Sequence, residues 1–149
     1  MVCGVSESKE ITGKEKEMTN EELAWAAGFF DGEGCVMIVK KRSAHAIRLA
    51  VCQVNPTPIN LFKKFFGGHT LYSTPKNKNW HPQWKWEQDS KSAYETLTKL
   101  LPYLIVKKDA VELALEFQKL KKKGRKITEQ DLIIEQEFKS KISHLNRKD

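Results

Sequence analysis

The sequence predicts an α+β domain in which helices and paired strands follow the order αββαββα, with two more helices at the C-terminal end. Apolar residues alternate with polar ones in two pairs of short segments, and they recur at helical spacing between and after these pairs. Glycine and proline separate the segments. Residues 1–18 are polar and are predicted to form a flexible tail, and residues 19–149 are predicted to form a single domain with a sizeable core.

The first helix is predicted to begin at Asn20, because Thr19 and Glu22 form the pattern of a capping box. Its apolar run extends to Phe30. We expect the helix to end abruptly in the segment Asp31-Gly32-Glu33-Gly34, before a strand begins at the next residue.

Two strands are predicted over Cys35–Arg42 and His45–Gln53, joined by a short turn. Side chains alternate along both strands, so one set faces the core. The core set is Val36, Ile38, Ile47, Leu49 and Val51. The opposite set is Met37, Val39, Lys41, Ala46, Arg48, Ala50 and Cys52.

A second helix is predicted to begin at Pro56 and to end at Gly67-Gly68. A second hairpin follows, over His69–Thr74 and Gln83–Gln88, with a basic loop between its strands. Trp84 and Trp86 share one face of its last strand. They could form a base-stacking platform, but a place in the sheet core is more typical of this spacing.

Three more helices complete the chain. They are predicted over Ser90–Leu101, over Asp109–Lys123 with Gly124 as the stop, and after Thr128, whose hydroxyl is suited to cap the last of them.

Composition favours a polyanionic partner, since the net charge is +7 and the pI is about 9.3. No run is long enough for a membrane span and the N-terminus lacks a signal-peptide core, so we expect an intracellular protein with no membrane partner, in a bacterial or phage-infected cytoplasm or in an organelle. Three cysteines without CxxC spacing argue against a disulfide framework or a zinc site. The histidines are scattered and are expected on the surface or in a groove: His45, His69, His81 and His144.

The segment Ala26–Gly34, with sequence AAGFFDGEG, gives the clearest indication of a functional site. It places the carboxylate of Glu33 between two glycines at the end of a helix, next to carbonyl groups that a helix end leaves unpaired. Carboxylate and carbonyl oxygens are the ligands that hard cations prefer. The segment is therefore a candidate cation site.

Gly28 costs this helix about 1 kcal/mol relative to alanine, so a close packing partner is expected to compensate. Ala24 and Gly28 lie on one helix face, and small residues there let another backbone approach. One candidate is the same helix of a second subunit, with Ala24, Ala27 and Gly28 at the interface. The alternative is a core helix of the same chain, which would contact Ala27 and Gly28.

The segment Ala26–Gly34 closely resembles the motif of the LAGLIDADG homing endonucleases. Two later segments strengthen the resemblance, which covers roughly residues 19–146: Gln53–Ile59 continuing to Phe65-Phe66-Gly67-Gly68, and Leu100–Ala110. Two differences are conservative: Ala26 stands where leucine is usual, and Glu33 stands for the commoner aspartate. The resemblance implies a four-stranded antiparallel sheet.

The resemblance also implies a catalytic site. Glu33 and the Gly32 carbonyl would bind Mg²⁺, with Mn²⁺ able to substitute, whereas Asp31 would close the helix end. Gln53 would position a water molecule. Lys107 best matches the family's active-site lysine, with Lys108 as a near alternative. A further basic residue of some members has no clear counterpart, and Arg48 and Lys64 are the two candidates.

The function implied is that of a site-specific double-strand DNA endonuclease from a mobile intron or intein. A single motif gives one acid, so cutting both strands of a partly palindromic site implies a homodimer. Bases would be read by Lys41, Arg48, Tyr72, Gln83 and Lys85, and phosphates contacted by Lys76, Lys78 and the run Lys119–Lys126. The alternatives are a non-cleaving binder, either an intron-RNA maturase or a DNA-binding regulator, and a basic scaffold for protein partners.

The predicted reading face also contains several apolar side chains, at Met37, Val39, Ala46, Ala50 and Cys52. This composition indicates either weak direct base reading at the centre of the site or a strand register that is displaced by one residue.

Overall fold

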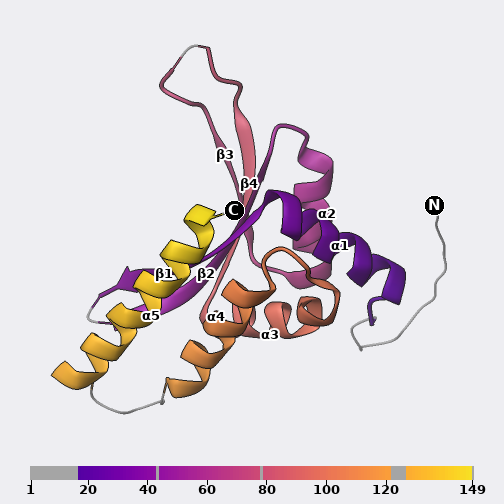
Figure 1. Cartoon of the computed structure of the whole chain (residues 1–149). Coiled ribbons are helices and arrows are strands. Elements are labelled where there is room, and N and C mark those ends of the chain that lie inside the picture. Colours follow the sequence, from indigo (N-terminus) through magenta and orange to yellow (C-terminus); the bar gives the residue numbers. More distant parts are fainter. Residues whose placement is uncertain (1–16, 43, 78, 122–126, 149) are drawn as a thin grey trace.

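The computed structural model describes residues 17–42, 44–77, 79–121 and 127–148 (Figure 1). The predicted flexible tail therefore lies almost wholly outside the described residues. The elements follow the predicted order αββαββα, and two C-terminal helices complete the chain. Among the described residues, no helix combines the length and the apolar character needed to cross a bilayer.

Helix α1 spans Asn20–Glu33 and begins with the predicted capping box. The Glu22 amide donates to Thr19 Oγ1 at 3.1 Å, and the Thr19 amide donates to Glu22 Oε1 at 2.9 Å. The helix ends within the predicted segment, at Glu33. It passes directly into a strand at Gly34, whose backbone is extended, so the strand begins one residue earlier than predicted.

Gly34 permits this junction through close packing rather than through an unusual φ angle. A Cβ atom at Gly34 would lie 2.3 Å from Cδ1 of the Phe30 ring, which is fully buried. At Gly28 and Gly32, by contrast, an added Cβ would meet nothing within 4 Å.

Four strands form one antiparallel sheet in the order β1-β2-β4-β3. They are β1 Gly34–Lys41, β2 Ala44–Gln53, β3 His69–Ser73 and β4 Gln83–Asp89. The register is the predicted one, since Val36 pairs with Leu49 and Ile38 with Ile47, both pairs on the core face. The alternative of a displaced register does not hold.

The remaining helices are α2 Pro56–Phe66, α3 Ser90–Leu100, α4 Lys108–Leu120 and α5 Glu129–Lys148, with a short 3-10 turn at Leu101–Tyr103. Helix α4 ends at Leu120 rather than at Lys123, because Lys121 already has extended backbone. The expected stop at Gly124 lies outside the described residues. Thr128 precedes α5, and its hydroxyl accepts from the Asp131 amide at 3.1 Å, as predicted for a cap.

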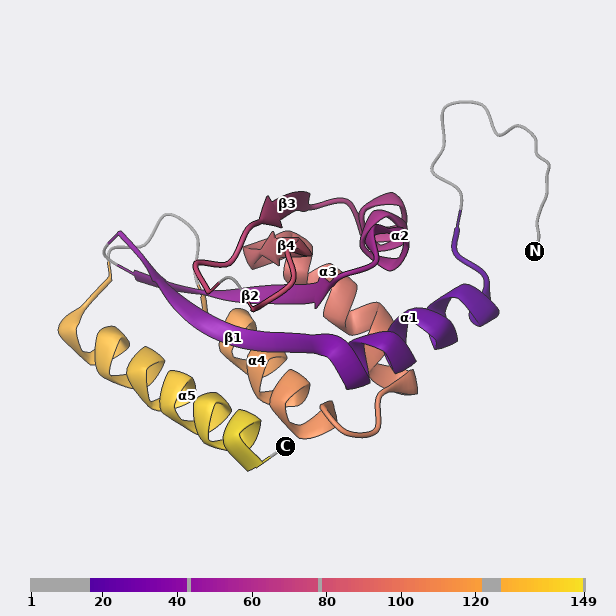
Figure 2. The same cartoon turned by 90° about the horizontal axis from the view of Figure 1, so that it is seen from above.

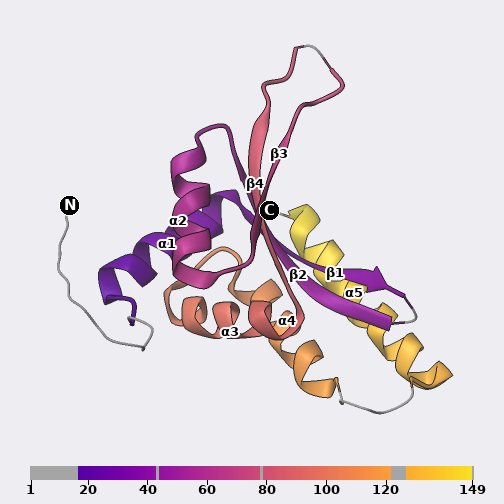
Figure 3. The same ribbon diagram turned by 180° about the vertical axis from the view of Figure 1, so that it is seen from behind.

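Helices α1 to α4 pack against one face of the sheet, where the core lies. Trp86 is fully buried, and its ring lies 5.1 Å from that of Phe62 in α2, so it belongs to the core and not to a stacking platform. Figure 3 shows the β3–β4 hairpin extending beyond the helices. The other face of the sheet carries the alternating residues of β1, β2 and β4 that point away from this core.

Helix α5 runs alongside the edge strand β1 (Figure 2). Asn146 Nδ2 donates to the Val36 carbonyl at 2.9 Å, which satisfies a backbone group on the outer side of β1. An edge strand exposes such groups, so α5 protects this edge from pairing with another strand.

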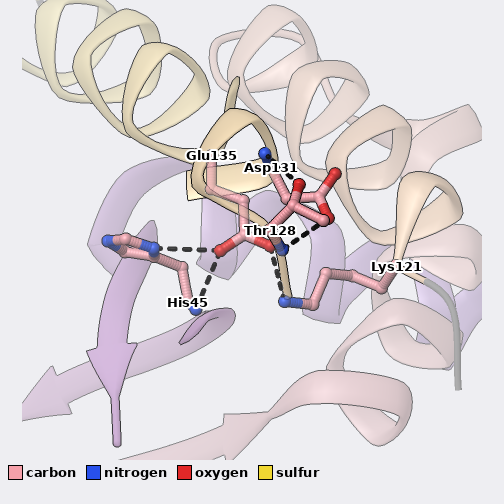
Figure 4. Close-up of polar contacts among 5 residues, drawn as sticks. All are labelled: His45, Lys121, Thr128, Asp131 and Glu135. Atoms are coloured by element: carbon pink, nitrogen blue, oxygen red, sulfur yellow. Dashed lines mark hydrogen bonds and ion pairs between the residues drawn. The ribbon is translucent and has the colours of Figure 1, made fainter. Parts of the chain in front are cut away.

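A buried ionic cluster fastens α5 to the β1–β2 hairpin (Figure 4). The Glu135 carboxylate accepts from the His45 amide at 3.0 Å, contacts His45 Nδ1 at 3.0 Å, and accepts from Lys121 Nζ at 2.8 Å. His45 is only 7% exposed, so its expected place on the surface is wrong. Its partner lies 90 residues away in the sequence, which explains why no local pattern indicates it.

Candidate functional site

Glu33 is the last residue of α1, and its side chain is exposed. Within the part of the chain that the structure describes, this carboxylate has no hydrogen bond or ion pair. The following residue, Gly34, pairs with Val51, so β2 passes beside the end of α1. Gln53 follows two residues later as the last residue of β2. The sheet thus brings the ends of α1 and β2, and with them Glu33 and Gln53, to one corner of the molecule.

Asp31 has a different role from Glu33, although only two residues separate them. Its carboxylate accepts from the Ile105 amide at 2.8 Å and from the Lys107 amide at 3.0 Å. These bonds attach the segment before α4 to the end of α1. The prediction that Asp31 closes the helix end therefore agrees with its contacts.

Lys107 is held at the same helix end by its side chain. Its Nζ donates to the backbone carbonyl of Asp31 at 2.9 Å, and the residue is only 9% exposed. A cation there satisfies a carbonyl left over by the helix and lies at the negative end of the helix dipole. Lys108, the near alternative, is the exposed first residue of α4. The structure thus places Lys107, and not Lys108, at the end of the motif helix.

The surroundings of this corner are partly apolar. Burial raises the pKa of the Cys35 thiol, and the nearby positive charge of Lys107 opposes that rise. The thiol is therefore neutral at neutral pH. The amide oxygen of Gln53 accepts from the Val54 backbone N–H at 2.9 Å, which leaves its NH₂ group as a donor.

The oxygen donors at this corner fit a hard cation but do not complete its coordination. The Glu33 carboxylate is available, and Gly32 contributes one of the last carbonyls of α1. No group of three or more His, Cys, Asp or Glu residues suited to a metal occurs among the described residues. A six-coordinate Mg²⁺ would therefore need further ligands from water, phosphate or a second subunit.

The open face of the sheet carries charged side chains that the strands align. From β1, β2 and β4, the residues of this face with charge are Lys41, Arg48, Lys85, Glu87 and Asp89. Arg48 donates to Asp89 through Nε at 2.9 Å and through Nη2 at 3.0 Å. Lys41 Nζ lies 2.6 Å from Asp89, and Lys85 Nζ lies 2.9 Å from Glu87.

The hydrogen bonds from Arg48 lower the pKa of Asp89, against the opposing effect of burial, and Lys41 adds to the lowering. The same hydrogen bonds raise the pKa of Arg48. The alternation along the predicted strand Gln83–Gln88 assigns Glu87 to the open face together with Lys85. It does not include Asp89, because β4 continues one residue beyond the predicted end.

One of the other predicted DNA contacts, Tyr72, is placed differently from expectation. Tyr72 pairs with Trp84, so it lies on the opposite face of the sheet from Lys85, and its ring is 4.7 Å from that of Trp84. Gln83, at the start of β4, shares the face of Lys85, and Lys76 is exposed in the loop before it. Lys78 and most of the Lys119–Lys126 run lie outside the described residues.

The predicted interface residues of α1 divide into two groups. Ala24 and Gly28 are exposed on the helix surface. Ala27 is fully buried in the core of its own chain and therefore does not face outward. Of the two candidates for the further basic residue, Arg48 is paired with Asp89, and Lys64 is exposed on α2.

No protein-family model and no curated protein sequence gives a significant match to the chain. Solved structures of homing endonucleases do match. I-CvuI in complex with its target is 25% identical with a TM-score of 0.65, and the match covers 84% of this chain and 82% of that one. The archaeal intron-encoded I-Vdi141I, complexed with DNA, has a TM-score of 0.70 at 15% identity, over 85% and 84% of the two chains.

The LAGLIDADG meganuclease I-AabMI, bound to uncleaved DNA, matches with a TM-score of 0.56 at 18% identity. That match covers 78% of this chain and 43% of the meganuclease. The shared fold agrees with the single AAGFFDGEG segment at the end of α1 and with the lysine beside it. The chain therefore has the fold of the LAGLIDADG homing endonucleases.

Proposed function

We propose that this protein is a site-specific, Mg²⁺-dependent endonuclease that cuts both strands of a long, partly palindromic DNA site as a homodimer. The observation that carries the proposal is the corner at the end of α1. An exposed carboxylate without a partner among the described residues lies there, at Glu33, and a buried lysine is fixed beside the same helix end, at Lys107. The DNA-bound structures of I-CvuI and I-Vdi141I support the same kind of partner.

The residues of this corner have distinct roles in phosphodiester hydrolysis. Glu33 and the Gly32 carbonyl would hold Mg²⁺, or Mn²⁺ in its place, and the bound cation would neutralise phosphate charge and acidify water. The Gln53 amide donates a hydrogen bond that orients the attacking water. Lys107 Nζ, which keeps two further N–H groups beyond its bond to Asp31, stabilises negative charge on the phosphate.

A second subunit supplies the second active site. Ala24 and Gly28 are exposed on one face of α1, and the absence of a side chain at Gly28 leaves room for the backbone of another helix. Packing of two α1 helices about a two-fold axis would place both Glu33 carboxylates near each other, one for each DNA strand.

The open sheet face contacts the DNA in this proposal. Lys41, Arg48, Gln83 and Lys85 face the bases, and the exposed Lys76 contacts phosphates from the loop. The apolar positions of the same face, such as Met37 and Val39, offer only van der Waals contact with thymine methyl groups.

The test is cleavage of a randomised double-stranded DNA library with Mg²⁺, in parallel with Ca²⁺. The Glu33→Gln protein is assayed beside it, and Glu137→Gln, which removes an exposed carboxylate from α5, is the matched control. We expect the wild type and the control to cut one enriched, partly palindromic sequence, and the Glu33→Gln protein to cut none. Cleavage by Glu33→Gln at the wild-type rate would contradict the proposal.

Specific binding by the wild type without any cutting would also contradict it. That result would favour a non-cleaving nucleic-acid binder, such as an intron-RNA maturase or a DNA-binding regulator, and intron RNA would be the next ligand.

A further inference from the structure

We propose that Asp89 is a positioning residue for base recognition, which holds the Arg48 guanidinium in the orientation that selects guanine. This inference rests on the proposed function, because it assumes that the open sheet face contacts DNA. It concerns a carboxylate at the end of β4 that has no part in the hydrolytic corner.

The two residues are direct cross-strand neighbours, since Arg48 of β2 pairs with Asp89 of β4. Their side chains form a two-point contact, with Nε on one carboxylate oxygen at 2.9 Å and Nη2 on the other at 3.0 Å. The side chains remain partly accessible, at 31% for Arg48 and 17% for Asp89. The pair is therefore oriented on the surface rather than buried in the core.

This contact determines which edge of the guanidinium remains free. The group has five N–H donors in a rigid plane, and Asp89 engages two of them, on the edge formed by Nε and Nη2. The donors left are both on Nη1 and the second on Nη2. They form the end-on edge, which is the edge that can bind O6 and N7 of guanine with two parallel hydrogen bonds.

Folding explains the carboxylate at this position only in part. The two-point ion pair contributes to stability, but the Asp89 side chain makes no capping hydrogen bond to α3, which follows it. A carboxylate facing a polyanion is unfavourable unless it is compensated. Lys41 compensates it here, with Nζ 2.6 Å from Asp89, so the three groups together carry one net positive charge.

The neighbouring ion pair on the same strand provides a contrast. Lys85 contacts Glu87 at 2.9 Å, but a lysine ammonium is a point charge without a planar fork. The contact with Glu87 therefore does not orient a particular set of Lys85 donors toward a base. Glu87→Gln is thus a matched control, because it removes a charge from the same face and leaves both Arg48–Asp89 hydrogen bonds in place.

The experiment measures base preference at each position of the selected site for the full-length protein, in a binding assay with Ca²⁺ and duplexes that differ at one base pair. Asp89→Asn, Arg48→Ala, the double variant and Glu87→Gln are compared with the wild type. Thermal unfolding of each variant checks that it is folded. We expect Arg48→Ala to lose a preference for guanine at one position of each half-site, on the order of tenfold.

Asp89→Asn should lose most of the same preference at the same position, and it should have no further effect on base preference in the Arg48→Ala background. Glu87→Gln should retain the preference. An unchanged preference in Asp89→Asn, with the wild type still selecting a defined site, would overturn the inference and leave the proposed function intact.

Two other results for Asp89→Asn would also overturn the inference. The first is DNA binding that is weakened equally at all positions of the site, and the second is a lost preference for cytosine at a position that Arg48→Ala does not affect. The first would reduce Asp89 to a structural residue, and the second would make it a direct base reader. Absence of any selected site in the wild type would instead count against the proposed function itself.

Discussion

At the scale of single residues, the end of α1 separates two carboxylates by role. The Asp31 carboxylate stabilises the fold, because it accepts hydrogen bonds from two backbone amides of the segment before α4. Glu33 has no partner among the described residues and is exposed. The fold therefore uses Asp31 and leaves the Glu33 carboxylate available for the role proposed above.

This contrast predicts opposite effects on stability. Asp31→Asn should lower the free energy of unfolding by about 1–2 kcal/mol, because the amide NH₂ faces a backbone donor where an oxygen accepted before. Glu33→Gln should change it by less than about 0.5 kcal/mol. Urea denaturation of both variants measures the difference, and an equal loss in both would show that Glu33 also supports the fold.

Asp89 predicts a pH dependence with a definite sign. Its pKa in the folded protein is lowered by Arg48 and, to a lesser extent, by Lys41. The stabilisation from its ionised form is therefore complete above its unfolded pKa of about 3.9, and it is lost as the pH falls through the lower folded value.

The wild type should accordingly exceed Asp89→Asn in free energy of unfolding by a constant amount from pH 7 to about pH 5, and by less as the pH falls below about 4. Urea denaturation across this pH range measures the difference in free energy of unfolding between the two proteins. A difference that grows as the pH falls would contradict the expectation.

At the scale of elements, local patterns predicted what is determined locally. The capping box of Thr19 fixed the start of α1, and alternation fixed which face of β1 and β2 is buried. Tyr72 was assigned to the opposite face from the one it occupies, because the pairing of β3 with β4 decides its side and no local pattern records that register. The Arg48–Asp89 pair joins residues 41 positions apart in the sequence, so it forms only because β2 and β4 are adjacent strands of the sheet.

The junction between α1 and β1 predicts that two glycines respond differently to alanine. Gly34→Ala should cost about 1–3 kcal/mol, since the new Cβ would lie 2.3 Å from the buried Phe30 ring. Gly28→Ala meets nothing within 4 Å in its own chain and should stabilise the isolated subunit by up to about 1 kcal/mol. Unfolding at low protein concentration measures both, and a stable Gly34→Ala protein would contradict the packing described at this junction.

The attachment of α5 predicts a further loss of stability. Glu135→Ala should lower the free energy of unfolding by about 2 kcal/mol, because the buried amide of His45 loses its acceptor and Lys121 loses its partner. Glu137→Ala, two residues along the same helix and exposed, should cost less than about 0.5 kcal/mol. Similar values for the two variants would mean that the cluster contributes nothing to the docking of α5.

At the scale of the whole molecule, one layer of helices covers one face of the sheet and leaves the other face uncovered by helices (Figure 1). The corner that carries Glu33 lies where α1 meets this sheet, so in the proposed function a DNA duplex on the open face would pass close to Glu33. The AAGFFDGEG segment predicted the position of Glu33 at the end of the first helix, directly before the first strand. It could not predict the charge compensation of the open face, which arises only when distant strands align Lys41, Arg48 and Asp89.

In the proposed function, Glu33 acts in DNA cleavage and not in folding or in DNA binding. The most direct measurement compares wild type and Glu33→Gln on the selected duplex, with cleavage followed in Mg²⁺ and affinity in Ca²⁺. We predict that the variant loses cleavage by a factor of roughly 100 or more and binds within about threefold of the wild type. Retained cleavage, or a loss of binding equal to the loss of cleavage, would contradict the account.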